Sequence, residues 1–111
     1  MRPKSRGKIS LKSTDPSDPP KIEPNYLTHP DDVRTLIEGI KLVRKIGNST
    51  AFNTFGAEFF DKPFPLCEHL PIDTDSYLEC FVKSMTTTDH HLIGTCKMGP
   101  YYDRMSVVDP K

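Results

Sequence analysis

The chain has 111 residues, enough for one small domain with a thin hydrophobic core. Only 35% of the residues are hydrophobic and 11 are proline, so a simple helix bundle is disfavoured and a loop-rich chain is expected. Basic and acidic residues number 15 each, and this zero net charge argues against a protein that binds nucleic acid or an anionic membrane. No apolar run approaches the roughly 18 residues of a membrane span, and no secretory signal follows Met1.

Residues 2–12 alternate between basic or polar and apolar side chains. This period of two predicts a strand with its basic face in solvent and with Ile9 and Leu11 turned toward the helices that follow. Gly7 permits a bulge or a close backbone approach in the middle of this strand. Its pairing partner is either residues 106–110 or a part of the protein outside this chain.

Residues 14–30 are rich in proline, with Asp and Ser beside the prolines. This composition predicts a series of turns and extended pieces. Ile22, Tyr26 and Leu27 can anchor it, so we expect an ordered loop that wraps over a neighbouring domain.

Two amphipathic helices are expected after this loop. The first covers about residues 31–46, where a capping box of Thr28 and Asp31 starts a continuous apolar stripe and Gly47-Asn48 supplies a left-handed stop. The second covers about residues 75–86 and ends at three threonines. With the strand and the long proline-rich loops, these helices predict an α+β fold.

The segment between the helices, residues 51–72, is aromatic. A phenylalanine cluster usually belongs to a core, and the alternative is a hydrophobic substrate funnel. A thin core also predicts apolar surface around residues 52–64 and marginal stability of the isolated chain. The cluster consists of Phe52, Phe55, Phe59, Phe60 and Phe64.

Side chains suited to catalysis are concentrated in residues 89–100, where His90 and His91 are adjacent. Imidazole is the side chain best suited to acid–base chemistry near neutral pH. Neighbours on an extended segment point to opposite faces, so only one of the two is expected to reach a pocket. The simpler interpretation is a turn with two surface histidines.

The remaining His and Cys residues do not favour a metal site or a nucleophile. Cys96 has no oxyanion-hole motif beside it. Cys67 and Cys80 can either form a disulfide in an oxidising compartment or remain small buried thiols. The possible metal ligands are His69, His90, His91 and Cys96. They lack i, i+4 spacing and a supporting carboxylate cluster, so no metal site is predicted.

Two motifs resemble a known family in the same order along the chain. Residues 91–100, His-Leu-Ile-Gly-Thr-Cys-Lys-Met-Gly-Pro, resemble the His-Pro-Val-Gly-Thr-Cys-Lys-Met-Gly signature of the glucose–methanol–choline (GMC) oxidoreductases, and the likeness continues through residues 105–110. Residues 2–7 and the proline-rich stretch up to residue 27 resemble the opening strand and loop of that family's C-terminal, substrate-side region. Residues 67–71 are most similar to its insect glucose-dehydrogenase branch. Leu92 departs from the commoner proline.

The resemblance covers essentially the whole chain and implies that residues 1–111 are a partial GMC C-terminal domain. In that family the histidine opening the signature lies at the reactive face of FAD and takes the substrate's hydroxyl proton as hydride passes to the flavin. This role falls on His91, and His90 would line the pocket. The implied activity is FAD-dependent oxidation of the CH–OH group of a small alcohol or sugar.

The chain contains no Gly-x-Gly-x-x-Gly, so the FAD-binding domain is expected elsewhere on the same polypeptide, and no cofactor-binding residue is assigned here. The family's last segment would follow Lys111, and Met1 stands where relatives have an internal residue. We therefore expect an internal fragment of a longer flavoenzyme, or a truncated gene product, that is inactive alone. The alternative from another class is a non-catalytic binding or interaction module derived from the family.

Overall fold

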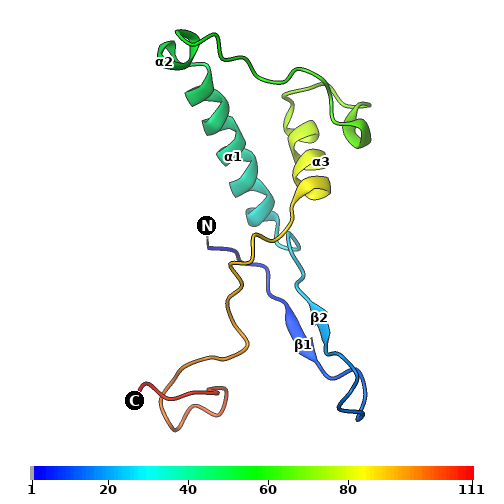
Figure 1. Ribbon diagram of the computed structural model, residues 1–111, viewed down its shortest axis with the longest axis vertical. Helices are drawn as coiled ribbons and strands as arrows, with labels where there is room; N and C mark the ends of the chain where they lie inside the picture. The colour runs from blue at the N-terminus through cyan, green and yellow to red at the C-terminus, as the bar shows by residue number, and fades with distance from the viewer. Residues whose placement is uncertain (1) are drawn as a thin grey trace. The chain divides into compact units, whose positions relative to one another are not determined.

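The computed structural model describes residues 2–111, which divide into two compact units (Figure 1). The helical unit comprises residues 2–6 and 25–86, and the loop unit comprises residues 7–24 and 87–111. The elements in chain order are β1 (Lys8–Ser10), β2 (Lys21–Glu23), α1 (Pro30–Gly47), α2 (Thr50–Asn53), the 3₁₀ turn η1 (Pro65–Cys67) and α3 (Asp75–Met85). The predicted α+β class is confirmed. No helix in residues 2–111 combines the length and apolar character needed to cross a membrane.

The first turn of α1 is capped by a histidine. His29 Nδ1 accepts a hydrogen bond from the backbone N–H of Asp31 at 3.1 Å. The predicted capping box is therefore wrong, because the Thr28 hydroxyl donates instead to the backbone carbonyl of Asn25 at 3.0 Å. An imidazole nitrogen thus caps this helix in place of the usual hydroxyl or carboxylate oxygen.

The end of α1 also differs from the expectation. Gly47 lies within the helix and Asn48 caps it with φ −85°, so the predicted left-handed stop is wrong. A different constraint acts on Gly47, because a Cβ there would lie 2.3 Å from the ring of Phe59. The same ring lies 5.7 Å from the Arg44 guanidinium carbon in a cation–π contact. Gly47 thus lets an aromatic side chain lie against the helix.

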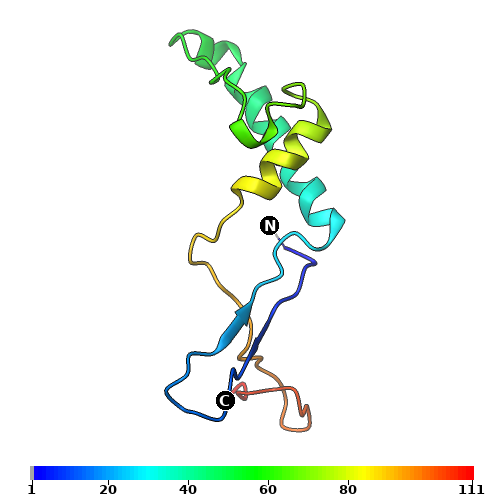
Figure 2. The ribbon, with the colours of Figure 1, turned by 90° about the vertical axis from the view of Figure 1, so that its right-hand side faces the viewer.

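The hydrophobic core lies between α1 and α3, which lie side by side in Figure 1 and cross one another in the turned view of Figure 2. The Thr74 hydroxyl caps α3 by accepting from the backbone N–H of Tyr77 at 3.2 Å, and Thr86 ends the helix as expected. An ion pair of 2.8 Å between Lys41 Nζ and Asp75 Oδ1 joins the two helices at the surface. The core is small, and its buried hydrophobic members are Val33, Ile37, Cys67, Tyr77, Leu78 and Val82.

The phenylalanine cluster lies mostly outside this core. Phe55 and Phe60 are 87% and 81% exposed, and Phe52 and Phe59 are also exposed. Only Phe64 packs against the core. The core prediction is wrong for the other four, because the described part of the unit has one pair of packed helices and no further layer to bury their rings. The expected apolar surface around residues 52–64 is present.

The β1 and β2 strands pair antiparallel, with Ile9 opposite Ile22. The β1 strand is shorter than the predicted strand over residues 2–12. Its partner β2 lies in the proline-rich segment, so both pairing partners expected from the sequence are wrong. The prolines and turns between β1 and β2 reverse the direction of the chain, so that the two strands form a hairpin. Leu11 is 86% exposed and Ile9 is half exposed, so their predicted burial against the helices is also wrong.

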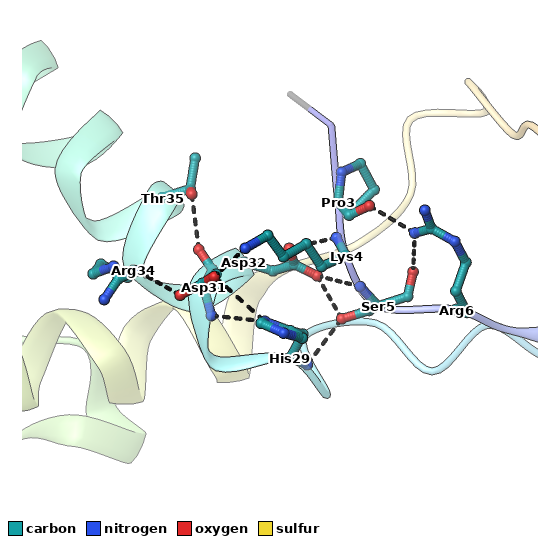
Figure 3. A network of polar contacts seen from close by, with 9 residues as sticks. All are labelled: Pro3, Lys4, Ser5, Arg6, His29, Asp31, Asp32, Arg34 and Thr35. Atoms are coloured by element: carbon teal, nitrogen blue, oxygen red, sulfur yellow. Dashed lines mark hydrogen bonds and ion pairs between the residues drawn. The ribbon is translucent and has the colours of Figure 1, made fainter.

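Residues 4–5 are held to α1 by a buried carboxylate (Figure 3). Asp32 is 4% exposed, and it accepts hydrogen bonds from the backbone N–H groups of Lys4 and Ser5 at 2.7 and 2.8 Å and from the Ser5 hydroxyl. Ser5 Oγ in turn accepts from the backbone N–H of His29 at 3.0 Å. These donors, led by the Lys4 N–H, lower the pKa of the Asp32 carboxyl from 3.8 to about 2. We call this arrangement the Asp32 clasp.

Substituting Gly7 by alanine is expected to disrupt the β1–β2 hairpin. A Cβ at Gly7 would lie 2.4 Å from the carbonyl oxygen of Glu23 and 2.7 Å from that of Pro24, and backbone atoms cannot move aside cheaply. The matched control is Gly39→Ala, since a Cβ at Gly39 meets nothing within 4 Å and alanine favours a helix interior by about 1 kcal/mol. Amide exchange should show lost protection of the strands in Gly7→Ala alone. Equal protection in both variants would contradict the close approach.

Candidate active site

Residues 89–100, called here the signature loop, follow α3 and lie in the loop unit. Residues 87–98 are all exposed, and the His91 side chain is 88% exposed. Within residues 2–111, no backbone–backbone hydrogen bond involves residues 87–96. The imidazole of His91 is therefore carried on an open stretch of chain and is accessible to a small molecule.

The backbone of the signature loop bends on both sides of His91. His90 has φ 60°, Gly94 φ 109° and Thr95 φ 64°. The left-handed conformation is unfavourable for His90 and Thr95, and such strain is often found at functional sites. The expectation that His90 and His91 point to opposite faces is not supported, because it assumed an extended backbone at His90.

A carboxylate lies beside the imidazole of His91. The Asp89 Oδ2 atom is 3.7 Å from His91 Nδ1, and both side chains are exposed. Solvent screens the interaction between two such exposed side chains strongly. The contact with Asp89 involves Nδ1 and not Nε2.

The end of the signature loop is closed onto residues 103–108. Met98 forms a parallel bridge with Val108, and the Gly99 N–H donates to the Val108 carbonyl at 3.1 Å. The Lys97 carbonyl accepts from the Val107 N–H at 2.8 Å. This closed turn anchors one end of the loop, and α3 precedes the other.

Side chains reinforce the closed turn. Lys97 forms an ion pair with Asp103, and the backbone N–H of Met105 donates to the same carboxylate at 2.9 Å. The hydrogen bond from Lys97, followed by that from Met105, lowers the pKa of Asp103 below its usual value. A Cβ at Gly99 would lie 2.2 Å from Ser106 Oγ, so this glycine permits the tight packing of the turn.

The other residues with chemically reactive side chains are possible metal ligands and cysteines. Within residues 2–111, no three His, Cys, Asp or Glu side chains are placed to hold a metal ion. Cys96 is a free, exposed thiol. The structure joins Cys67 and Cys80 in a disulfide, which the sequence left open.

Two acidic residues at these sites were missed by the sequence reasoning. Asp89 could have been found from its place two residues before His91. Nothing in the sequence distinguishes Asp32 from Asp31, because both are aspartates in the first turn of the same helix. Only the tertiary contacts distinguish the buried Asp32 from the partly exposed Asp31.

Comparisons with known proteins match the chain along almost its full length. It is 43% identical over 109 residues to the glucose dehydrogenase (FAD, quinone) of Drosophila melanogaster, covering 98% of this chain and 17% of that protein. It is 40% identical over 111 residues to the alcohol dehydrogenase (acceptor) of Pseudomonas putida, covering 99% and 18%. It is 36% identical over 112 residues to the oxygen-dependent choline dehydrogenase of Brucella ovis, covering 100% and 19%.

The chain thus spans less than a fifth of the length of these curated relatives. A family model described as GMC oxidoreductase matches residues 3–111. That match includes both the clasped N-terminal segment and the signature loop with its exposed imidazole. The chain therefore belongs to the GMC oxidoreductase family.

Proposed function

We propose that this chain supplies one side of the active site of an FAD-dependent oxidoreductase acting on the CH–OH group of a small alcohol or sugar. The observation that carries the proposal is the accessible imidazole of His91 at the head of the signature loop. The names of the relatives support the substrate class, since they act on glucose, an alcohol and choline. The relative from Drosophila melanogaster also supports FAD as the cofactor.

The described residues fit one face of a flavin site. A Cβ at Gly94 would meet no atom within 4 Å, so the loop has room for a flat ring to approach its backbone. The chain has no Gly-x-Gly-x-x-Gly to hold the pyrophosphate, and we assign that part to another portion of the same polypeptide. When bound, FAD supplies the acceptor for the hydride.

His91 is proposed to act as the general base. Its Nε2 accepts the proton of the substrate hydroxyl as the neighbouring C–H hydrogen leaves as hydride, so the alcohol becomes a carbonyl. Asp89 lies beside the other ring nitrogen, Nδ1. His90, next to the base on the same bend, is proposed to line the substrate pocket.

The test uses the longest natural polypeptide that contains this chain. We expect it to purify with bound flavin and to lose the oxidised-flavin absorbance when mixed anaerobically with a substrate from a panel of sugars, primary alcohols and choline. A polypeptide that binds flavin yet is reduced by none of these would contradict the substrate class. One that binds no flavin would favour a non-catalytic module.

A further inference from the structure

The segment after the exposed phenylalanines is tied covalently to α3. Cys67, at the end of η1, has no exposed surface, and its disulfide partner Cys80 lies half-buried on α3, 13 residues later. Both sulfurs lie at the hydrophobic core, where Cys67 is a member and Cys80 packs against it. The bond thus joins a short irregular segment to one of the two helices that form the core.

Few other interactions hold this segment in place. The Phe64 N–H donates to the Tyr77 hydroxyl at 2.9 Å, and the Phe64 ring packs edge-on against Phe81 at 5.6 Å. The backbone hydrogen bonds of η1 are local, from Cys67 to the Phe64 carbonyl and from Leu70 to the Cys67 carbonyl. The disulfide is therefore the strongest connection between residues 64–71 and α3.

The first two residues of this segment line an apolar groove, next to residues 59–63. The groove has a volume of about 630 Å³, and its lining includes Leu36 and Ile40 of α1, Phe64 and Pro65, and Leu78 and Phe81 of α3. Detaching residues 64–71 would remove Phe64 and Pro65 from this lining and expose core side chains of α3. The attachment of this short segment to α3 thus keeps part of the small core covered from solvent.

We propose that the Cys67–Cys80 disulfide is a structural latch formed by thiol oxidation during folding, so that this chain matures in an oxidising compartment. Disulfides persist in such compartments and are reduced in the cytosol. A chain with so few buried hydrophobic residues gains much from a covalent crosslink, because the crosslink limits the freedom of the unfolded chain. Cys96, exposed and unbonded in the same structure, has no comparable role.

Forming the latch removes two protons and two electrons from the two thiols. The electrons go to the disulfide of a thiol–disulfide oxidoreductase. One cysteine thiolate attacks that disulfide and forms a mixed disulfide, and the second thiolate attacks the mixed disulfide. The Cys67–Cys80 bond results, and the oxidant leaves as a dithiol that carries the two electrons.

The first test is peptide mapping of the longest natural polypeptide from its native source, alkylated before reduction. We expect one crosslinked peptide pair containing Cys67 and Cys80, while Cys96 is alkylated. Alkylation of both Cys67 and Cys80 before reduction would overturn the proposal.

The second test measures whether the bond holds the segment. Glu68 is exposed and immediately follows the turn, so a glutamate-specific protease can report on its opening. Adding dithiothreitol should speed cleavage after Glu68 by roughly 10²-fold, the gain expected from closing a loop of about 15 residues. The Cys96→Ser variant should respond equally and serves as the control.

A double variant, Cys67→Ala with Cys80→Ala, should be cleaved rapidly with or without dithiothreitol. If this variant does not fold, the wild-type protein and Cys96→Ser still decide the question, since both keep the latch. Cleavage after Glu68 that is unchanged by dithiothreitol in both would overturn the proposal.

Discussion

Replacing His91 by alanine in the longest natural polypeptide is expected to lower kcat/KM for the alcohol or sugar by roughly 10²–10⁴, the usual contribution of a positioned proton acceptor. The loss is expected because we assign the acceptance of the hydroxyl proton to the His91 imidazole. Flavin content should remain unchanged, since we assign the dinucleotide site to another part of the polypeptide. The measurement is the rate of anaerobic flavin reduction by substrate, followed against pH.

The matched control is His90→Ala, which removes the neighbouring imidazole from the same strained bend. Its effect should be smaller and should appear mainly in KM, because we assign His90 to the pocket lining and not to proton transfer. If kcat/KM fell by a similar, modest factor in both variants and followed their stability, both histidines would be ordinary surface residues. Flavin reduction in His91→Ala at the wild-type rate would show that the base is another residue.

Replacing Asp32 by asparagine is expected to release residues 4–5 from α1. The amide keeps the shape of the carboxylate, but its NH₂ group would face one of the backbone N–H donors of Lys4 or Ser5. Losing these hydrogen bonds should reduce amide-exchange protection at Lys4 and Ser5 by roughly 10- to 100-fold. Exchange at these two amides, followed by NMR or mass spectrometry, measures the effect directly.

The control for the Asp32 clasp is Asp31→Asn, which changes the same charge one residue away. Asp31 pairs with the exposed side chains of Lys4 and Arg34, so its loss should affect these amides little. Equal loss of protection in both variants would mean that charge at the helix N-terminus, and not the buried carboxylate, holds the segment.

The clasp also predicts an acid dependence. The pKa of Asp32 is about 2 in the folded chain against an ordinary 3.8, so its stabilisation is present above about pH 4 and is lost as the pH falls toward 2. In Asp32→Asn this part of the acid sensitivity should be absent. Protection of the Lys4 and Ser5 amides that stays constant from pH 5 to pH 2 in the wild-type chain would contradict the assignment.

The two main helices could be predicted from the sequence because their signals are local. An apolar stripe and a terminating threonine run lie within the helices themselves or next to them, so α1 and α3 appear close to the expected residues. The signature loop could also be identified from the sequence, since its motif is a contiguous run of residues. The close approach at Gly7 is one of the two alternatives, a bulge or a close approach, that a glycine in a strand pattern predicts.

What depended on distant residues was not predictable in this way. The partner of β1, the exposure of four phenylalanines and the burial of Asp32 depend on which groups lie across from them in space. Alternation marks Ile9 and Leu11 as one face of a strand, but a face is buried only if another layer covers it, and in the described residues none does. Local pattern thus determined the helices and the family signature. Tertiary structure alone decided the hairpin partner, the clasp and the covalent tie of Cys67 to α3, because each joins residues that no sequence period connects.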